Sequence, residues 1–471
     1  MGRRISVLVI FLSVLLIISI ALPAFAEVKF SWGPYLRIRN EYYKNMKDLA
    51  DPDDGRGRDT ANRIKIKTQL WGKADFDKDT SIYLRLANEN LAYFYFEGTS
   101  GAHVDKSASK KGYHYDPNEI FVDNLYLDVK NVLGNPVDLR IGRQDLGGQY
   151  GEGFLITDGT AGDGGRSGYF NAIKASWKIN KANTLDLIYI NNPRDEEYLP
   201  LINRMGLTYA GSSLADKYMS QNLVATDEEG FVVYLKNKDV KNLNLEAYYM
   251  FKTEAKEGGS GVYFGEKTKL STVGSYAKYS FAPYTLRTQL AYQFGDYGSE
   301  DRTGVGGYLY LDRDLKDIIK TWSPSVTLGG IYLSGQDRKT PENEGWDPLW
   351  SKYPWISDSY IFTLLGETGT NAYWTNLGAI RGIVNLKPTS KSGVMLAYTY
   401  MRAIETVPKS TALTGFTGTS KERGGLAQAK YSYKFNKNFD GYFLAEYFMP
   451  GSFYIGDDPS LLLRTELVMK F

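Results

Sequence analysis

The feature that most constrains this chain is a repeated alternation of apolar and charged side chains in segments of about ten residues. The chain ends in one such segment, LLLRTELVMKF, where Leu463 and Leu467 alternate with Arg464 and Glu466 before the terminal Phe471. Successive side chains of a β-strand point to opposite faces, so this segment predicts a strand with one apolar and one charged face. A half-buried strand of a soluble sandwich shows the same alternation, so the pattern alone does not decide the fold.

Segments of this kind recur along the whole chain. We predict about eighteen strands, at residues 33–43, 62–74, 81–94, 119–131, 137–146, 168–180, 184–192, 229–237, 243–254, 269–281, 285–297, 304–312, 322–333, 375–386, 393–402, 423–435, 440–448 and 461–471. Their length suits tilted strands that cross a bilayer, and an even number closes an antiparallel barrel with both termini on one side. The predicted fold is therefore all-β: one closed antiparallel transmembrane β-barrel.

The lengths of the connections support a barrel independently. Short turns such as DFDKDT, NVLGNP, KINKAN, FAPY, LKPTSKSG and FNKNFD fall between every second pair of segments. The other connections are long and polar, the largest at about 44–61, 95–117, 147–167, 193–228, 334–374 and 403–422. Outer-membrane barrels alternate short periplasmic turns with long extracellular loops in this way.

The N-terminal segment predicts export. Residues 1–26 combine Arg3 and Arg4, an apolar run from Ile5 to Ile20, and a small-x-small ending at Ala24–Ala26. This is typical of a secretory signal peptide cleaved after Ala26, although the apolar run is also long enough for an uncleaved anchor. The predicted domains are thus a signal peptide, 1–26, and an outer-membrane barrel, 27–471.

Composition agrees with a bacterial envelope protein. The chain has no cysteine, which excludes a disulfide framework, and it has 37 tyrosines, which suit aromatic girdles at the two membrane interfaces. Without Arg3 and Arg4 the mature chain is formally neutral, so bulk charge predicts no nucleic-acid partner. We expect outer-membrane lipid around the barrel, no cofactor and no metal.

The face opposite the apolar one would line an aqueous lumen, and cations outnumber anions on it. An eighteen-stranded barrel encloses water, and charges along such a lumen concentrate counter-ions, carboxylates especially when the lining carries arginine. The lining predicted to bind and select the solute comprises Arg37, Arg39, Arg63, Lys65, Lys67, Arg85, Arg140, Arg143, Gln144, Lys174, Arg287, Arg402 and Arg464. Arg143, Asp123 and Arg381 fit the two-face assignment poorly, which predicts a bulge or an error of register near each.

Other interpretations remain open. The same cations could pair with carboxylates across neighbouring strands and only brace the wall. A structural barrel or surface adhesin would then have a blocked lumen and would act through its outer loops. An enzyme is disfavoured, because His103 and His114 are the only histidines and the chain has neither a P-loop nor a G-x-S-x-G elbow.

One stretch carries more than alternation. Residues 138–177, DLRIGRQDLGGQYGEGFLITDGTAGDGGRSGYFNAIKASW, contain an R-x-G-R-Q run followed by a loop rich in glycine and aspartate. This stretch resembles the alginate export family of outer-membrane barrels, as do GWDPLW at 345–350, NAYWTNL at 371–377 and AEYFMPGSFY at 445–454.

The resemblance implies a monomeric eighteen-stranded barrel, folded by the barrel-assembly machinery, whose basic lumen passes an anionic polysaccharide of uronate type or small anions. It singles out Arg140, Arg143 and Gln144, with Asp158, Asp163 and Arg166 in the following loop as a lid or constriction. The periplasmic turns are short, and only 313–322 has any substance, so the sequence does not separate export from uptake.

Overall fold

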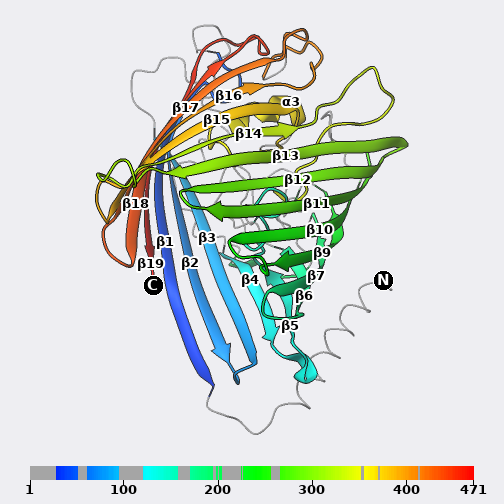
Figure 1. Ribbon diagram of the computed structural model, residues 1–471, viewed down its shortest axis with the longest axis vertical. Helices are drawn as coiled ribbons and strands as arrows, with labels where there is room; N and C mark the ends of the chain where they lie inside the picture. The colour runs from blue at the N-terminus through cyan, green and yellow to red at the C-terminus, as the bar shows by residue number, and fades with distance from the viewer. Residues whose placement is uncertain are drawn as a thin grey trace, which may run out of the picture.

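A computed structural model describes residues 28–50, 61–94, 120–157, 170–194, 198–199, 201–203, 224, 226–255, 266–351, 355–369, 372–411 and 414–471. Antiparallel strands dominate it (Figure 1). The strands are β1 (Lys29–Lys44), β2 (Ala61–Asp75), β3 (Thr80–Phe94), β4 (Ile120–Val129), β5 (Val137–Gln144), β6 (Phe170–Lys178), β7 (Asn183–Asn192), β8 (Leu201–Asn203), β9 (Glu228–Asn237), β10 (Leu243–Glu254), β11 (Thr268–Phe281), β12 (Tyr284–Tyr297), β13 (Glu300–Asp314), β14 (Ser325–Leu333), β15 (Leu377–Leu386), β16 (Ser392–Arg402), β17 (Glu422–Lys434), β18 (Phe439–Pro450) and β19 (Ser460–Lys470).

The sheet closes on itself. β1 pairs with β2 on one side and with β19 on the other, so the first and last strands are neighbours. β7 pairs directly with β9, while the three-residue β8 only touches the end of β4. The remaining eighteen strands each have two antiparallel neighbours and form a closed barrel, which confirms the fold expected from the sequence.

The alternation of connection lengths is also confirmed. At one end of the barrel, short turns join β2 to β3, β4 to β5 and each later pair up to β17 and β18, and both ends of the described chain lie there as well. The turn between β4 and β5 contains a 3₁₀ turn, η2 (Val132–Gly134). The longest short-end connection, residues 315–324, falls where the sequence indicated one of some substance. The connections at the other end are long, with one exception: β12 and β13 are joined there by only residues 298–299.

The two faces of the wall have the expected chemistry. On β12 the side chains of Leu290, Tyr292 and Phe294 are exposed on the outside, whereas Gln289 and Gln293 are buried inside. Exposed leucine, isoleucine, valine and aromatic side chains recur on the outer face of the other strands. An apolar exterior around a polar interior is the arrangement that a bilayer stabilises.

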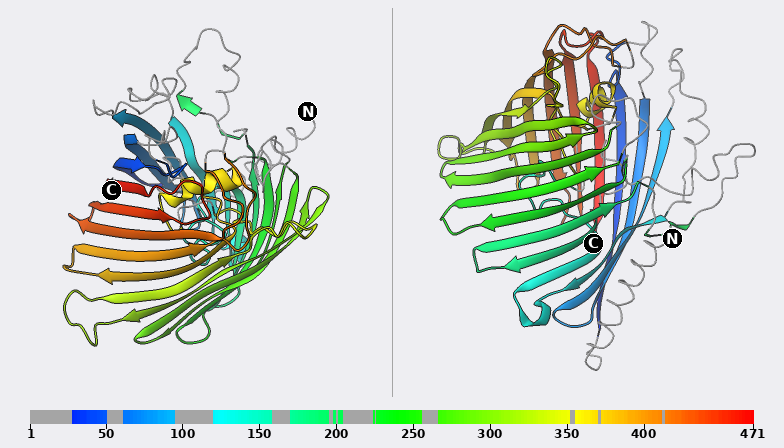
Figure 2. Two further views of the ribbon diagram at one scale, coloured as in Figure 1. Left: turned by 90° about the horizontal axis from the view of Figure 1, so that it is seen from above. Right: turned by 90° about the vertical axis from the view of Figure 1, so that its right-hand side faces the viewer.

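Inserted loops fill part of the interior. A helix, α3 (Tyr360–Thr368), lies inside the ring of strands (Figure 2), where Tyr360, Ile361 and Leu364 are fully buried. Ser357 starts this helix, because its hydroxyl accepts hydrogen bonds from the backbone amides of Ser359 and Tyr360. No helix in the described residues is long and apolar enough to cross a membrane.

Two glycines of the wall make room for the inserted loop. A Cβ at Gly306 of β13 would come within 2.6 Å of the Trp346 ring, and one at Gly230 of β9 within 2.9 Å of the Trp350 ring. Both tryptophans belong to one hydrophobic cluster with Tyr150 and Phe154 of the loop after β5. The core of this barrel is therefore built by loops packed against the inner wall.

Candidate functional site: the charged lining of the barrel

A basic strip runs along the inner face of β19, β1 and β2. At its centre the buried Glu41 carboxylate contacts four cations: Arg63 at 2.7 Å, Arg464 at 2.7 Å, Lys65 at 3.4 Å and Arg39 at 3.7 Å. The antiparallel register places these side chains together, since Glu41 lies opposite Arg63 on one side and Arg464 on the other. The strip consists of Arg37, Arg39, Arg63, Lys65, Lys67 and Arg464, with Glu41 and Glu466.

The strip has more cations than wall carboxylates. Glu466 accepts a hydrogen bond of 2.6 Å from Arg39 Nε, and its carboxylate also lies 3.9 Å from Arg37 Nε. A third carboxylate comes from an inserted loop, where Asp358 lies 2.5 Å from Arg464 Nη1. Five of the six cations therefore contact Glu41, Glu466 or Asp358 within the described side chains.

Arg85 continues the basic lining onto β3. Its guanidinium contacts Asp123 at 2.5 Å and Asp145 at 2.9 Å, and Gln69 also donates to Asp123. Asp123 occupies a bulge, because the pairing of β3 with β4 shifts register between Arg85 and Leu86. The bulge predicted near Asp123 is thus confirmed, and it turns this carboxylate inward against the arginine.

Two further arginines form forked pairs with carboxylates of a neighbouring strand. Arg140 binds both oxygens of Asp128, at 2.7 and 2.9 Å, and Arg287 binds both oxygens of Asp312, at 2.6 and 3.1 Å. Arg287 also contacts Glu152, from the inserted loop after β5, at 2.7 Å. Such bidentate pairs hold the guanidinium in one plane and in one orientation.

Lys174 points inward as predicted. Its ammonium group contacts the Gln149 side chain and lies 3.9 Å from Asp186 and 5.4 Å from the centre of the Tyr150 ring. Asp186 is shared with Lys236, at 2.8 Å. This lysine is therefore one of two cations that share a single carboxylate.

Other ion pairs fasten the inserted segment 334–376 to the wall. Arg302 of β13 contacts Asp347 at 3.0 Å, and Tyr373 donates a hydrogen bond of 2.8 Å to the same carboxylate. Arg423 of β17 contacts Glu367 of α3 at 2.7 Å. These side chains are almost completely buried. Burial and the Asp347 carboxylate raise the pKa of Tyr373 well above its usual range, so its hydroxyl stays protonated and keeps donating.

The N-terminus of α3 is held by a carboxylate of the wall. Glu446 of β18 accepts hydrogen bonds from the hydroxyls of Ser357 and Ser359, at 2.7 Å each, and from the backbone amide of Ser359 at 2.8 Å. A negative charge is favourable at this end of a helix. The wall thus fixes where Asp358, the loop carboxylate that reaches Arg464, is presented.

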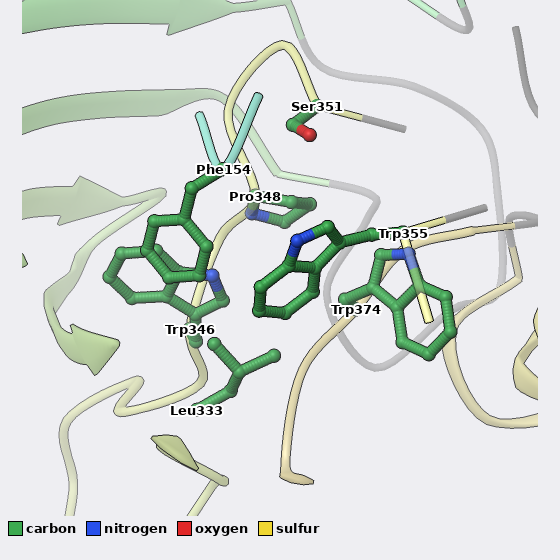
Figure 3. Close-up of a pocket in the computed structure, with 7 residues that line it drawn as sticks. All are labelled: Phe154, Leu333, Trp346, Pro348, Ser351, Trp355 and Trp374. Atoms are coloured by element: carbon green, nitrogen blue, oxygen red, sulfur yellow. The ribbon is translucent and has the colours of Figure 1, made fainter. Parts of the chain in front are cut away.

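A small cavity lies among the aromatic side chains of the inserted loops. Phe154, Leu333, Trp346, Pro348, Ser351, Trp355 and Trp374 line it (Figure 3). It has room for about one water-sized sphere. A volume of this size holds no solute, so the loops pack tightly at this point. The described residues contain no group of three or more histidine, aspartate or glutamate side chains placed to hold a metal ion.

The prediction that Arg402 lines the lumen is wrong, and two other predicted lining residues bind the backbone of the wall. Arg402 lies on the outer face beside Tyr398 and Tyr400, with 59 % of its side chain exposed, because it has the same strand parity as these tyrosines. Arg143 and Gln144 are both buried, and they donate hydrogen bonds to the backbone carbonyls of Val122 and Ala172. Asp158, Asp163, Arg166, His103 and His114 lie outside the described residues.

The irregularity expected near Arg381 is absent, because this side chain is buried inside and β15 pairs with both neighbours without a shift of register. Near Arg143 the pairing of β5 also keeps its register, but the preceding Gly142 has a φ of 125°, so the backbone is irregular there as predicted. The sequence reasoning also missed Lys252, Arg302 and Arg423. Lys252 shares its strand parity with Glu246, so alternation alone was sufficient to find it, whereas Arg423 occupies a register shift opposite Met401 and Arg402.

Comparison with known proteins identifies the fold. No family model matches the chain, and no curated protein matches it. Among solved structures of Pseudomonas aeruginosa proteins, OccK5 (OpdH) has 11% sequence identity and a TM-score of 0.52, and the match covers 95% of this chain and 100% of that one. OpdO has 10% identity and a TM-score of 0.54, with 94% and 97% covered. OpdK in complex with vanillate has 10% identity and a TM-score of 0.54, with 95% and 100% covered.

The chain shares their fold. At 10–11% identity this likeness establishes a closed eighteen-stranded antiparallel barrel, of the kind found in an outer-membrane protein such as OpdK. The comparisons do not support the resemblance to the alginate export family, which stays a prediction.

Proposed function

We propose that this protein is a monomeric outer-membrane channel that passes small carboxylate-bearing solutes. The observation that carries the proposal is the basic strip, where arginines and lysines of three neighbouring strands gather on the inner face of a barrel whose outside is apolar. Charges in a narrow lumen with low-dielectric walls concentrate counter-ions more strongly than charges on an open surface. The strip therefore favours anions, and its arginines favour carboxylates.

Two contacts between loops and wall indicate where a solute carboxylate would bind. Asp358 contacts Arg464, and Glu152 contacts Arg287, and both carboxylates belong to inserted loops. Their side chains keep 23% and 27% of their surface exposed, unlike the almost completely buried Asp347 and Glu367. A solute carboxylate can compete for Arg287, whose own side chain keeps 22% of its surface exposed. Arg464 has 3% exposed, so a solute reaches it by displacing Asp358.

The filled interior favours a small solute over a polysaccharide chain. The inserted loops and the inner face of the wall form one hydrophobic cluster, to which Leu49, Trp346 and Tyr360 belong. Passage of an acidic polysaccharide would require this cluster to separate. OpdK, whose fold is similar, has been solved with vanillate, a small aromatic carboxylate, which is consistent with the same size class. Oligouronates remain a second candidate cargo on the basis of the arginines alone.

Conductance through planar bilayers tests the proposal. The purified mature chain should form channels whose reversal potential in a chloride gradient shows a preference for chloride over potassium, and benzoate or vanillate should reduce the current. A tetrauronate should reduce it only if longer acids also reach the strip. A barrel that inserts but conducts no ions would support the alternative of a structural barrel or adhesin, and a preference for potassium would contradict the proposal. We propose no catalytic role.

A further inference from the structure

We infer that the short-turn end of the barrel carries a separate binding site for soluble multivalent carboxylates, formed by a ring of lysines on its inner edge. This inference builds on the proposed function, because it names where an anion is first bound. The ring, which we call the lysine ring, consists of Lys29, Lys73, Lys130, Lys178, Lys238, Lys278, Lys387, Lys391, Lys434 and Lys470.

Strand parity places these lysines on the inner edge. Lys178 and Lys278 follow the inward-facing Lys174 and Tyr276 at even spacing on β6 and β11. Lys434 and Lys470 do the same after Lys430 on β17 and Glu466 on β19. Lys130, Lys238, Lys387 and Lys391 lie one residue beyond the end of a strand, at inward positions next to β4, β9, β15 and β16. The ten lysines are therefore spread around the barrel and do not form a patch on one wall.

Carboxylates neutralise only part of the ring. The inner edge carries five aspartates, Asp75, Asp79, Asp138, Asp314 and Asp440, against ten lysines. Three of the lysines pair with them: Lys73 with Asp75 at 2.5 Å, Lys178 with Asp138 at 2.7 Å, and Lys470 with Asp440 at 3.2 Å. Within the described residues the other seven form no ion pair, and all seven are exposed: Lys29, Lys130, Lys238, Lys278, Lys387, Lys391 and Lys434.

The adjoining short turns do not offset this excess. Apart from the ring, they carry the lysines Lys78, Lys181, Lys241, Lys316, Lys320 and Lys437, and the aspartates Asp77, Asp239 and Asp317. Lysines thus outnumber aspartates by six to three on the turns as well. The whole mouth has a positive field although the mature chain is formally neutral.

The type of cation indicates the class of ligand. An exposed lysine gains little from a single carboxylate, because water and salt screen the pair. A ligand with several carboxylates contacts several lysines at once, and its small gains add up. Lysine is also a point charge without the arginine fork, so it selects for charge number and not for one geometry. The ring therefore suits di- and tricarboxylates better than monocarboxylates.

Isothermal titration of the detergent-solubilised barrel tests this site with citrate and acetate at low ionic strength. We expect citrate to bind and acetate to bind at least about tenfold more weakly. The triple substitution Lys130→Gln, Lys278→Gln and Lys434→Gln should weaken citrate binding at least about tenfold, because it removes unpaired members of the ring and exposes no carboxylate. A matched triple variant of the turns, Lys181→Gln, Lys320→Gln and Lys437→Gln, should change it by less than about twofold.

Two outcomes would overturn the inference. One is citrate affinity equal to that of acetate, and the other is an equal loss of affinity in both triple variants. If phosphatidylglycerol in mixed micelles binds through the ring lysines while citrate does not, the mouth is a lipid-headgroup site and the inference is wrong. Binding needs no current, so a barrel that binds citrate but conducts nothing would reject the proposed function and keep the ring.

Discussion

The loop-filled half of the barrel and its short-turn mouth use charge in opposite ways. In the loop-filled half, Arg302 and Arg423 are almost completely buried, and each is matched to a carboxylate of the inserted segment. At the mouth, Lys278 and Lys434 are exposed and form no ion pair within the described residues. Burial makes an unpaired charge costly, so the interior matches its charges, whereas water at the mouth permits an excess.

This difference indicates which charges can act on a solute. A matched and buried pair holds a loop in place and offers nothing to a passing anion. An exposed excess attracts anions but contributes little to stability. The basic strip lies between these extremes, since Glu41 is completely buried while Asp358, on the same arginine, stays partly exposed. Substitutions in the three regions should therefore separate loss of stability from loss of selectivity.

The largest effect is expected in the loop-filled half. Glu367→Ala leaves Arg423 buried without its carboxylate, and breaking a buried pair in this way costs about 3–5 kcal/mol. The variant should unfold at lower temperature in detergent, and its segment 334–376 should become sensitive to protease. The double variant Glu367→Leu with Arg423→Leu removes both charges and should recover most of the loss. If Glu367→Ala has wild-type stability, this pair does not fasten the loop.

Much of this contrast was open to prediction, but its details were not. Alternation with period two predicted the number of strands and the inward position of Arg39, Arg140 and Arg464, because parity within a strand depends only on local sequence. Arg402 was assigned to the wrong face. It has the same strand parity as the exposed Tyr398 and Tyr400, so the alternation itself places it outside.

Pairing across strands was beyond the sequence. The four contacts of Glu41 depend on the register of β1 with β2 and with β19, the last strand of the chain, and a shift of one residue would have separated them. The insertion of segment 334–376 was equally hidden. Its stretch GWDPLW looks like a polar loop with aromatic residues, and only the closed wall, with glycines opposite Trp346 and Trp350, gives it a place to be buried.

The second effect, in order of size, concerns the forked pairs. Arg140→Ala with Arg287→Ala removes two cations and leaves Asp128, Asp312 and Glu152 without them. The reversal potential should shift from chloride preference toward potassium preference. The chloride-to-potassium permeability ratio should fall by a factor of several. Arg402→Ala is the matched control, because it removes an arginine from the outer face and should leave selectivity unchanged. Unchanged selectivity in the double variant would mean that both arginines only brace the wall.

A smaller effect is expected at the contact between loop and strip. Asp358→Asn keeps the backbone hydrogen bond to Glu446 but removes the charge that neutralises Arg464. Chloride preference should rise and vanillate should bind more tightly, while stability falls by about 1 kcal/mol or less, since the pair is partly exposed. Asp347→Asn, at an almost completely buried pair, should instead lower stability without raising anion preference. A fall in chloride preference on Asp358→Asn would place Arg464 outside the conducting path.

The smallest effect is expected at the mouth, and it sharpens the comparison most directly. Lys434→Gln removes an exposed charge that forms no ion pair within the described residues, so the unfolding temperature should change by less than the equivalent of about 0.5 kcal/mol. Arg423→Gln, on the same strand but completely buried, should cost about 3–5 kcal/mol. Thermal unfolding of both variants in one detergent measures the two losses of stability and their ratio. If the two losses were similar, exposure would not be what divides the stabilising charges of this barrel from those left to attract a solute.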